Sequence, residues 1–157
     1  MKLNALFPYA DKGELRKWMI RLFSMAKILV VDDSPTVLAI ASAMLLEAGH
    51  EVVTSASAQS ALKMLVDGDS IDIILTDIEM PVMDGFEFIR EIRRHSPRTP
   101  VIAMSGATGG STLLRLGKQG GACCTLKKPF TQPEITQAVA TAIDASSRLK
   151  QKLGIGR

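Results

Sequence analysis

The sequence predicts an α/β protein whose core is a five-stranded parallel sheet with helices on both faces. From Lys27 onward, short runs of β-branched residues alternate with segments of helical period, which is typical of repeated strand–helix units. Five such units can be counted, and no low-complexity linker separates them. We therefore expect one domain with a single sheet.

Each unit can be assigned from its own residues. The apolar runs predict strands at residues 27–31, 51–56, 71–76, 100–104 and 122–127. Helical periodicity predicts helices from Pro35 to just before Gly49, and over 58–66, 85–95, 111–119 and 131–149. Ser34 and Asp84 are suited to cap two of these helices, and Thr131 with Glu134 forms a capping box for the last one.

Composition bounds the class of protein. The chain has 157 residues and is 46% hydrophobic, enough for one globular core. No apolar run reaches the roughly 18 residues that would span a bilayer, and no secretory signal is visible, so we expect a cytoplasmic protein. Cys123 and Cys124 are adjacent and on a strand would face opposite sides, which excludes a disulfide framework.

The net charge of +3 is unevenly distributed. Residues 1–24 hold five Lys or Arg and two acidic residues, and residues 148–157 hold four Lys or Arg and no acid. The body between them is therefore acidic. Because nucleic-acid binding needs cationic residues gathered on one face, we do not expect nucleic acid as a partner.

Polar residues follow the strands at one edge of the expected sheet. Asp32 and Asp33 follow the first strand, Asp77 the third, Ser105 the fourth and Lys128 the fifth. The carboxyl ends of parallel strands meet at one edge, so these side chains can come together in space. Clustered carboxylates repel one another unless a cation lies between them. Oxygen ligands without His or Cys favour Mg²⁺.

A carboxylate-bound metal beside a lysine is also suited to a phosphoryl group, because both cations neutralise charge on its oxygens. Asp77 is then the natural nucleophile, since a carboxylate can form an acyl phosphate. Ser105 would hydrogen-bond a phosphoryl oxygen after transfer. The alternative for Asp32 and Asp33 is an acidic cluster that favours the dipole of the following helix. The matching positions of Asp77 and Lys128 argue against that alternative.

The motifs "VVDDSP", "LTDIEMPVMDGFEF", "AMSG" and "KKPF" resemble, in order and spacing, the receiver domain of two-component response regulators over roughly residues 26–147. The resemblance implies a flavodoxin-like doubly wound sheet with strand order 2-1-3-4-5. It also implies a cis peptide bond before Pro129. We accordingly divide the chain into an extension (1–24), a receiver domain (25–149) and a basic tail (150–157).

The resemblance assigns roles residue by residue. It implies that Asp77 is the phospho-acceptor and that Mg²⁺ is bound by Asp32, Asp33, Asp77 and the backbone carbonyl of Glu79. Ser105 takes the position of the switch hydroxyl, and Lys128 that of the lysine that contacts the phosphoryl group.

Three positions depart from the family's usual pattern. Thr125 replaces an aromatic residue three positions before Lys128, so the usual coupling of hydroxyl to ring is in doubt. Glu79 and Ala107 flank the expected phosphoryl group and would tune the attack of water.

The first 24 residues contain an apolar helical face and an opposite basic face. The apolar positions are Leu15, Trp18, Met19, Leu22 and Phe23, and the basic ones are Arg16, Lys17 and Arg21. This segment could bind an anionic membrane, bind a partner helix, or pack on its own domain; translation starting at Met25 is a further alternative.

The expected function is a phosphorylation-activated signalling switch that has no effector domain in the chain and is no enzyme beyond its own transfer and dephosphorylation. A histidine kinase or histidine phosphotransfer protein would donate the phosphoryl group. The downstream protein would bind the face built from the helix at 111–119, the fifth strand and the last helix, and the chain would be a monomer or a phosphorylation-dependent dimer. The alternatives are a phosphorylation-independent scaffold, a phosphate sink, or an aspartyl-phosphate hydrolase.

Overall fold

The computed structural model describes residues 25–106 and 119–154. The extension at 1–24, the helix expected at 111–119 and Ala107 lie outside these residues, apart from Gln119. The described part contains five strands, β1 (Lys27–Val31), β2 (Glu51–Ser55), β3 (Ile73–Asp77), β4 (Val101–Ser105) and β5 (Cys124–Lys127). Its labelled helices are α2 (Pro35–Glu47), α3 (Ala58–Val66), α4 (Gly85–His95) and α6 (Gln132–Lys152).

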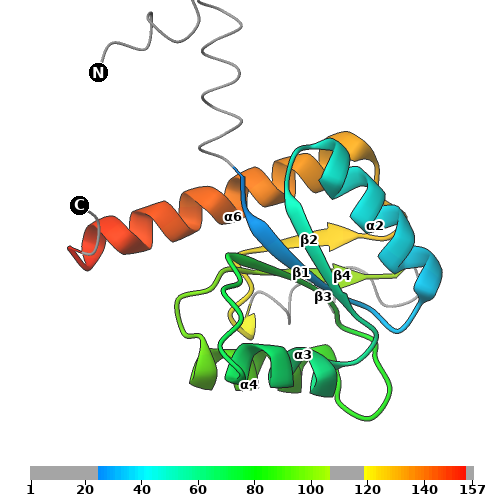
Figure 1. Cartoon of the computed structure of the whole chain (residues 1–157), viewed down its shortest axis with the longest axis horizontal. Coiled ribbons are helices and arrows are strands. Elements are labelled where there is room, and N and C mark those ends of the chain that lie inside the picture. The colour runs from blue at the N-terminus through cyan, green and yellow to red at the C-terminus, as the bar shows by residue number, and fades with distance from the viewer. Residues whose placement is uncertain (1–24, 107–118, 155–157) are drawn as a thin grey trace, which may run out of the picture.

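All five strands are parallel and lie in the order β2-β1-β3-β4-β5, which confirms the predicted fold. The chain starts near the middle of the sheet, moves outward to β2, and returns across β1 to β3. The strand order therefore reverses between β1 and β3, where open α/β sheets bind their ligands. Figure 1 shows α2 and α6 on one face of the sheet and α3 and α4 on the other.

The strands are buried on both faces, as their nearly continuous apolar runs require. Alternate residues of β1 belong to different cores: Ile28 and Val30 pack with α2 and α6, whereas Leu29 and Val31 pack with α3 and α4. Phe88, fully buried, is the largest side chain of the second core. The two cores hold the sheet rigidly between the helix layers and fix the position of its carboxyl edge.

The predicted caps of α2, α4 and α6 are confirmed. The Ser34 side chain accepts a hydrogen bond from the backbone N–H of Val37, and Asp84 caps α4. Thr131 and Glu134 form the predicted capping box of α6. α6 runs to Lys152, three residues beyond its predicted end, so the first part of the expected basic tail is helical.

Several strand boundaries differ from the prediction. β3 begins at Ile73 rather than at residue 71, and the preceding Asp72 lies beside the start of β1, where its carboxylate accepts the N–H of Lys27 at 2.8 Å. β5 begins at Cys124 rather than at residue 122. Asp77 and Ser105 are the last residues of their strands rather than the first residues of the loops. Both side chains are consequently buried by the sheet.

Candidate functional site

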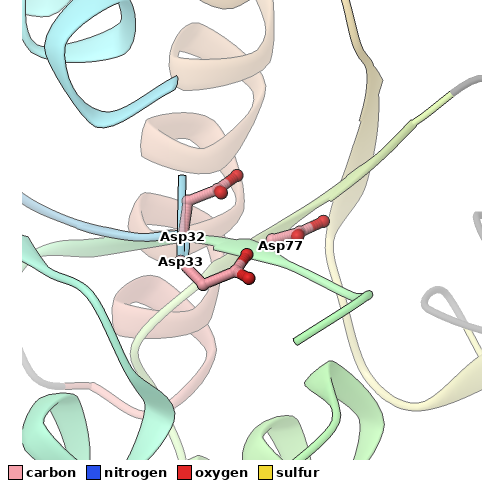
Figure 2. A group of neighbouring side chains, drawn as sticks. All are labelled: Asp32, Asp33 and Asp77. Carbon is pink, nitrogen blue, oxygen red and sulfur yellow. The ribbon is translucent and has the colours of Figure 1, made fainter. Parts of the chain in front are cut away.

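Three carboxylates meet at the reversal point of the sheet. Asp32 and Asp33 directly follow β1, and Asp77 is the last residue of β3, which pairs with β1. One oxygen from each of the three side chains lies within 4.8 Å of the others. Figure 2 shows the three side chains leaving adjacent strand ends with their carboxylates gathered together.

The three carboxylates have different environments. Asp32 is fully buried, and its Oδ1 accepts the N–H of Ser34 at 2.9 Å, which fixes the turn into α2. Asp77 is 2% exposed, whereas Asp33 is open to solvent. The contact of Asp32 agrees with the alternative that this acid stabilises the start of the following helix. That alternative does not explain why Asp33 and Asp77, which cap no helix, lie beside Asp32.

Lys128 lies between the two buried carboxylates. Its Nζ is 3.0 Å from Oδ2 of Asp32 and 3.2 Å from Oδ1 of Asp77. Its backbone N–H donates to the carbonyl of Ser105 at 2.7 Å, and the peptide bond to Pro129 is cis, as predicted. Burial alone would lower the pKa of the Lys128 ammonium, but the two carboxylates outweigh it and the pKa is raised. The two carboxylates therefore favour the charged form of Lys128.

The pKa of Asp77 is raised from its ordinary value. Loss of solvation on burial is the largest cause and the charge of Asp32 adds to it, while Lys128 and the backbone of Glu79 act in the opposite direction. Oδ1 of Asp77 accepts no well-aligned hydrogen bond from the described residues, so its contact with Lys128 is an ion pair of poor angular geometry. A buried carboxylate oxygen with so little compensation is costly unless a ligand completes its contacts.

Gly85 lets the start of α4 approach the end of β3 closely. A Cβ on Gly85 would lie 2.5 Å from Cα of Ile78 and 2.6 Å from the carbonyl oxygen of Asp77, closer than any side chain allows. The sequence placed Gly85 only at the start of the predicted helix at 85–95. Its packing against β3 could not be read from the chain.

The structure places the other predicted residues as follows. Ser105 is fully buried at the end of β4, and its Oγ donates to the carbonyl of Gly106 at 3.4 Å. The Glu79 side chain is exposed. Thr125 lies within β5, half-buried and paired in register with Ala103. The carbonyl contact predicted for Glu79 stays a prediction.

The adjacent cysteines differ from the expectation. Cys123 precedes β5, so strand alternation does not separate it from Cys124, and the two Sγ atoms lie 3.8 Å apart. Neither forms a disulfide, and both are half-buried. They lie at the start of β5, whereas the three carboxylates lie at or just after the ends of their strands.

The donor set of the acid cluster suits Mg²⁺. Its ligand atoms are all carboxylate oxygens, and Asp33 is reachable from solvent. Oδ1 of Asp77 accepts no hydrogen bond from the described residues and can therefore take a further ligand. Among the helices within residues 25–106 and 119–154, none has the length and apolarity to cross a bilayer.

Comparison with known proteins gives a consistent family. Residues 28–140 match the family model of the response regulator receiver domain. The chain is 39% identical over 110 residues to the two-component response regulator ARR11 of Arabidopsis thaliana, covering 69% of this chain and 21% of that protein. It is 38% identical over 112 residues to the transcriptional regulatory protein TcrA of Mycobacterium tuberculosis, covering 71% of this chain and 44% of the relative. The chain thus spans less than half the length of these relatives.

Solved structures agree. A response regulator receiver domain protein from Clostridium thermocellum superposes with a TM-score of 0.73 at 33% identity, covering 80% of this chain and 99% of that one. The chemotaxis protein CheY4 of Vibrio cholerae superposes with a TM-score of 0.68 at 34% identity, covering 75% and 98%. Fold, acid cluster and sequence match agree: the chain belongs to the response regulator receiver domain family of two-component systems.

Proposed function

We propose that this domain is a switch that accepts a phosphoryl group on Asp77, with Mg²⁺ bound at the acid cluster. One observation carries the proposal: a buried carboxylate at the reversal point of the sheet lies beside two further acids and one lysine. Asp32, Asp33, Asp77 and the backbone carbonyl of Glu79 would bind the ion. When bound, the ion would supply positive charge to neutralise the phosphoryl oxygens.

In the proposed transfer, a carboxylate oxygen of Asp77 attacks phosphorus and the bond from phosphorus to the donor's imidazole nitrogen breaks. The imidazole keeps the electron pair and takes up a proton, and Asp77 becomes an acyl phosphate. Lys128 balances the added negative charge, because its ammonium already lies 3.2 Å from the acceptor carboxylate. The chain's own contribution is to position the nucleophile and exclude water from it.

The switch itself is a choice between two loop arrangements. Before transfer, the carbonyl of Ser105 accepts the backbone N–H of Lys128, so the ends of β4 and β5 are linked. After transfer, the Ser105 hydroxyl would leave its weak contact with Gly106 and bond a phosphoryl oxygen. An added charge that is held in one arrangement and not in the other shifts the population toward it.

An apolar hollow beside the site supports a protein as the donor. It has a volume of about 360 Å³ and is lined by Val37, Ile40, Phe130 and Pro129, with Lys128 and Gly106 at its side. A histidine kinase or histidine phosphotransfer protein could pack there while it presents its phosphohistidine.

We propose the cytoplasm as the compartment. We also propose the face of β5, α6 and residues 111–119 as the output surface, and a monomer or a phosphorylation-dependent dimer as the assembly.

The test is the intact mass of the protein after incubation with Mg²⁺ and a small acyl phosphate. We expect a single phosphate adduct on the wild type and none on Asp77→Asn. Asp69→Asn is the matched control, because Asp69 is an exposed acid in the loop before β3. Chelation of Mg²⁺ should abolish the adduct on both the wild type and the control.

The other outcomes discriminate among the alternatives. No adduct on a wild type whose circular dichroism shows an intact fold would favour a phosphorylation-independent scaffold. Continuous release of phosphate over many turnovers would favour a hydrolase. An adduct that forms but changes neither partner binding nor the amide spectrum would favour a phosphate sink.

A further inference from the structure

A groove runs along α6 at the amino edge of the sheet, opposite the acid cluster. It consists of two adjoining hollows of about 170 and 260 Å³ that share Asp72, Ser146 and Lys150. Met25 lines the first hollow and Leu149 the second. We call these two hollows the α6 groove.

The end of α6 beside this groove has no cover within the described residues. All buried residues of α6 lie at or before Ala142, and none follows over the remaining ten residues of the helix. Leu149 is 39% exposed and Leu153 54% exposed. Figure 1 shows this end of α6 extending past the sheet. Helices derive most of their stability from packing an apolar face, and the exposed Leu149 and Leu153 leave apolar surface that a further segment can cover.

The place where residues 1–24 join the domain identifies the occupant. Residue 24 is bonded to Met25, which lines the groove and is itself 58% exposed. Consecutive Cα atoms lie about 3.8 Å apart, so Leu22 and Phe23 cannot lie more than roughly 12 Å from Met25. A segment tethered at the rim of a groove meets it at an effective concentration near millimolar, without a separate binding partner.

This segment has an apolar face that can pack on the apolar part of the groove lining, which includes Ile71, Ile143 and Leu149. Leu15, Trp18, Met19, Leu22 and Phe23 recur at spacings of three and one, which places them on one face of a helix. With that face inward, the basic residues of the segment point to solvent and away from Arg98 and Lys150, which both line the groove. We propose that residues 14–24 form an amphipathic helix that packs its apolar face into the α6 groove and covers the end of α6.

Trp18 gives a direct probe, because it is the only tryptophan of the chain. In the full-length protein we expect Trp18 emission at a shorter wavelength than in urea, with low quenching by acrylamide. Leu149→Asp should move the emission toward the unfolded position and raise the quenching constant about twofold or more, because an undocked face is open to solvent. Val66→Asp is the matched control: Val66 is an exposed apolar residue on α3, on the other face of the sheet, and its change should leave Trp18 unaffected.

A second variant probes the same contact from the segment. Leu22→Asp with Phe23→Asp in the full chain should speed amide hydrogen exchange at the end of α6 and leave exchange in β1 and β3 unchanged. Both variants change exposed or segment residues, so circular dichroism should report an intact domain.

Three results would overturn the proposal. One is a wild-type Trp18 as accessible to acrylamide as in urea. Another is a blue-shifted Trp18 that depends on protein concentration, which would assign the groove to a second copy. The third is an accessible Trp18 that becomes protected only with vesicles of anionic lipid, which would make the segment a membrane-binding helix.

Discussion

Lys128 shows how strongly one residue determines the charge balance of the site. Its ammonium is the cation that the structure places between Asp32 and Asp77, both almost fully buried. Removing one partner of such a group leaves uncompensated buried charge, which costs far more than the intact arrangement gains. The residue is therefore needed for stability before any ligand arrives.

We predict that Lys128→Ala lowers the free energy of unfolding by about 2 kcal/mol or more in metal-free buffer, because two buried carboxylates lose their counter-charge. Urea denaturation measures the change. Lys127→Ala is the matched control, since Lys127 is exposed at the end of β5 and should change stability little. Equal stabilities of the two variants would contradict the charge balance described here.

Cys123 is a second residue whose chemistry depends on its neighbours. The hydrogen bond with Cys124 is the largest cause that lowers its pKa to about 7, burial acts in the opposite direction, and the guanidinium of Arg93 helps to lower it. We predict that the alkylation rate of Cys123 by iodoacetamide is half-maximal near pH 7, about 1.5 units below an ordinary thiol. Peptide mapping after alkylation at a series of pH values measures this.

Cys123→Ser is the control for that experiment and should remove the phase with the low midpoint. A midpoint at the value of an ordinary thiol would show that the short distance between the two sulfurs does not stabilise the thiolate. The sequence offered no sign of this property. Strand alternation predicted opposite orientations, and only the placement of Cys123 before β5 brings the sulfurs together.

At the scale of elements, the sequence predicted the order of the strands and helices within residues 25–106 and 119–154 correctly, because periodicity and caps are local signals. Ser34, Asp84 and Thr131 each cap a helix at the predicted position. The strand ends were less accurate, since they depend on neighbours distant in sequence. The carboxylate of Asp72 accepts a hydrogen bond from the N–H of Lys27, 45 residues away, and no local sequence pattern predicts that contact.

The sequence predicted which residues form the candidate site, but not how they are arranged or buried. End-of-strand positions and the topology of a parallel sheet are enough to bring Asp33, Asp77 and Lys128 together. The burial of Asp77, its under-compensated oxygen and its close approach to Gly85 depend on packing across the sheet. These properties become visible only when the loop is placed against β3.

The loop between β3 and α4 provides a test at this scale. We predict that Gly85→Ala destabilises the domain by about 2 kcal/mol or more and lowers phosphate uptake by Asp77, because its Cβ would collide with backbone rather than with a flexible side chain. Gly68→Ala is the comparison: Gly68 has a positive φ of +92° but nothing within 4 Å of an added Cβ, so only backbone strain of about 1 kcal/mol is expected. A Gly85→Ala protein as stable as Gly68→Ala would mean that the loop can shift away from β3.

His50 links the loop before β2 to the start of β1. Its Nδ1 accepts the backbone N–H of Ala26 at 3.3 Å, which requires a neutral ring, and burial lowers its pKa below 6.5. In the unfolded chain His50 therefore binds a proton near pH 6.5, whereas in the native protein it binds that proton only at lower pH. The stability due to His50 is present above pH 6.5 and is lost as the pH falls through the lower native pKa.

We predict that His50→Gln shows a shallower loss of unfolding free energy below pH 6.5 than the wild type, because the amide does not titrate. Urea denaturation at several pH values between neutrality and pH 5 measures the slope. The same replacement at His95, exposed at the end of α4, serves as the control for loss of an imidazole. Identical slopes for the wild type and His50→Gln would contradict a protonation cost at this position.

At the scale of the whole molecule, the two edges of the sheet carry different tasks. The carboxyl edge holds the acid cluster, where repulsion among three carboxylates opposes folding in the absence of a cation. The amino edge holds the α6 groove, which the extension is proposed to cover. The body between them is two packed cores that contain no residue of the acid cluster.

This arrangement predicts that Mg²⁺ stabilises the whole domain, because an ion that binds only the native state shifts the unfolding equilibrium. At a free Mg²⁺ concentration about one hundred times its dissociation constant, the wild type should gain about 2.7 kcal/mol in unfolding free energy.

Asp77→Asn should behave in the opposite way. It should be more stable than the wild type in chelator, because a buried carboxylate with a raised pKa has been replaced by a neutral group, and it should gain little from Mg²⁺. Thermal denaturation of both proteins with Mg²⁺ and with chelator therefore gives curves whose order reverses. Asp69→Asn should follow the wild type in both conditions. If the wild type gained no stability from Mg²⁺ while keeping its fold, the acid cluster would be a strained feature of the sheet and not a metal site, and the proposed transfer to Asp77 would lose its support.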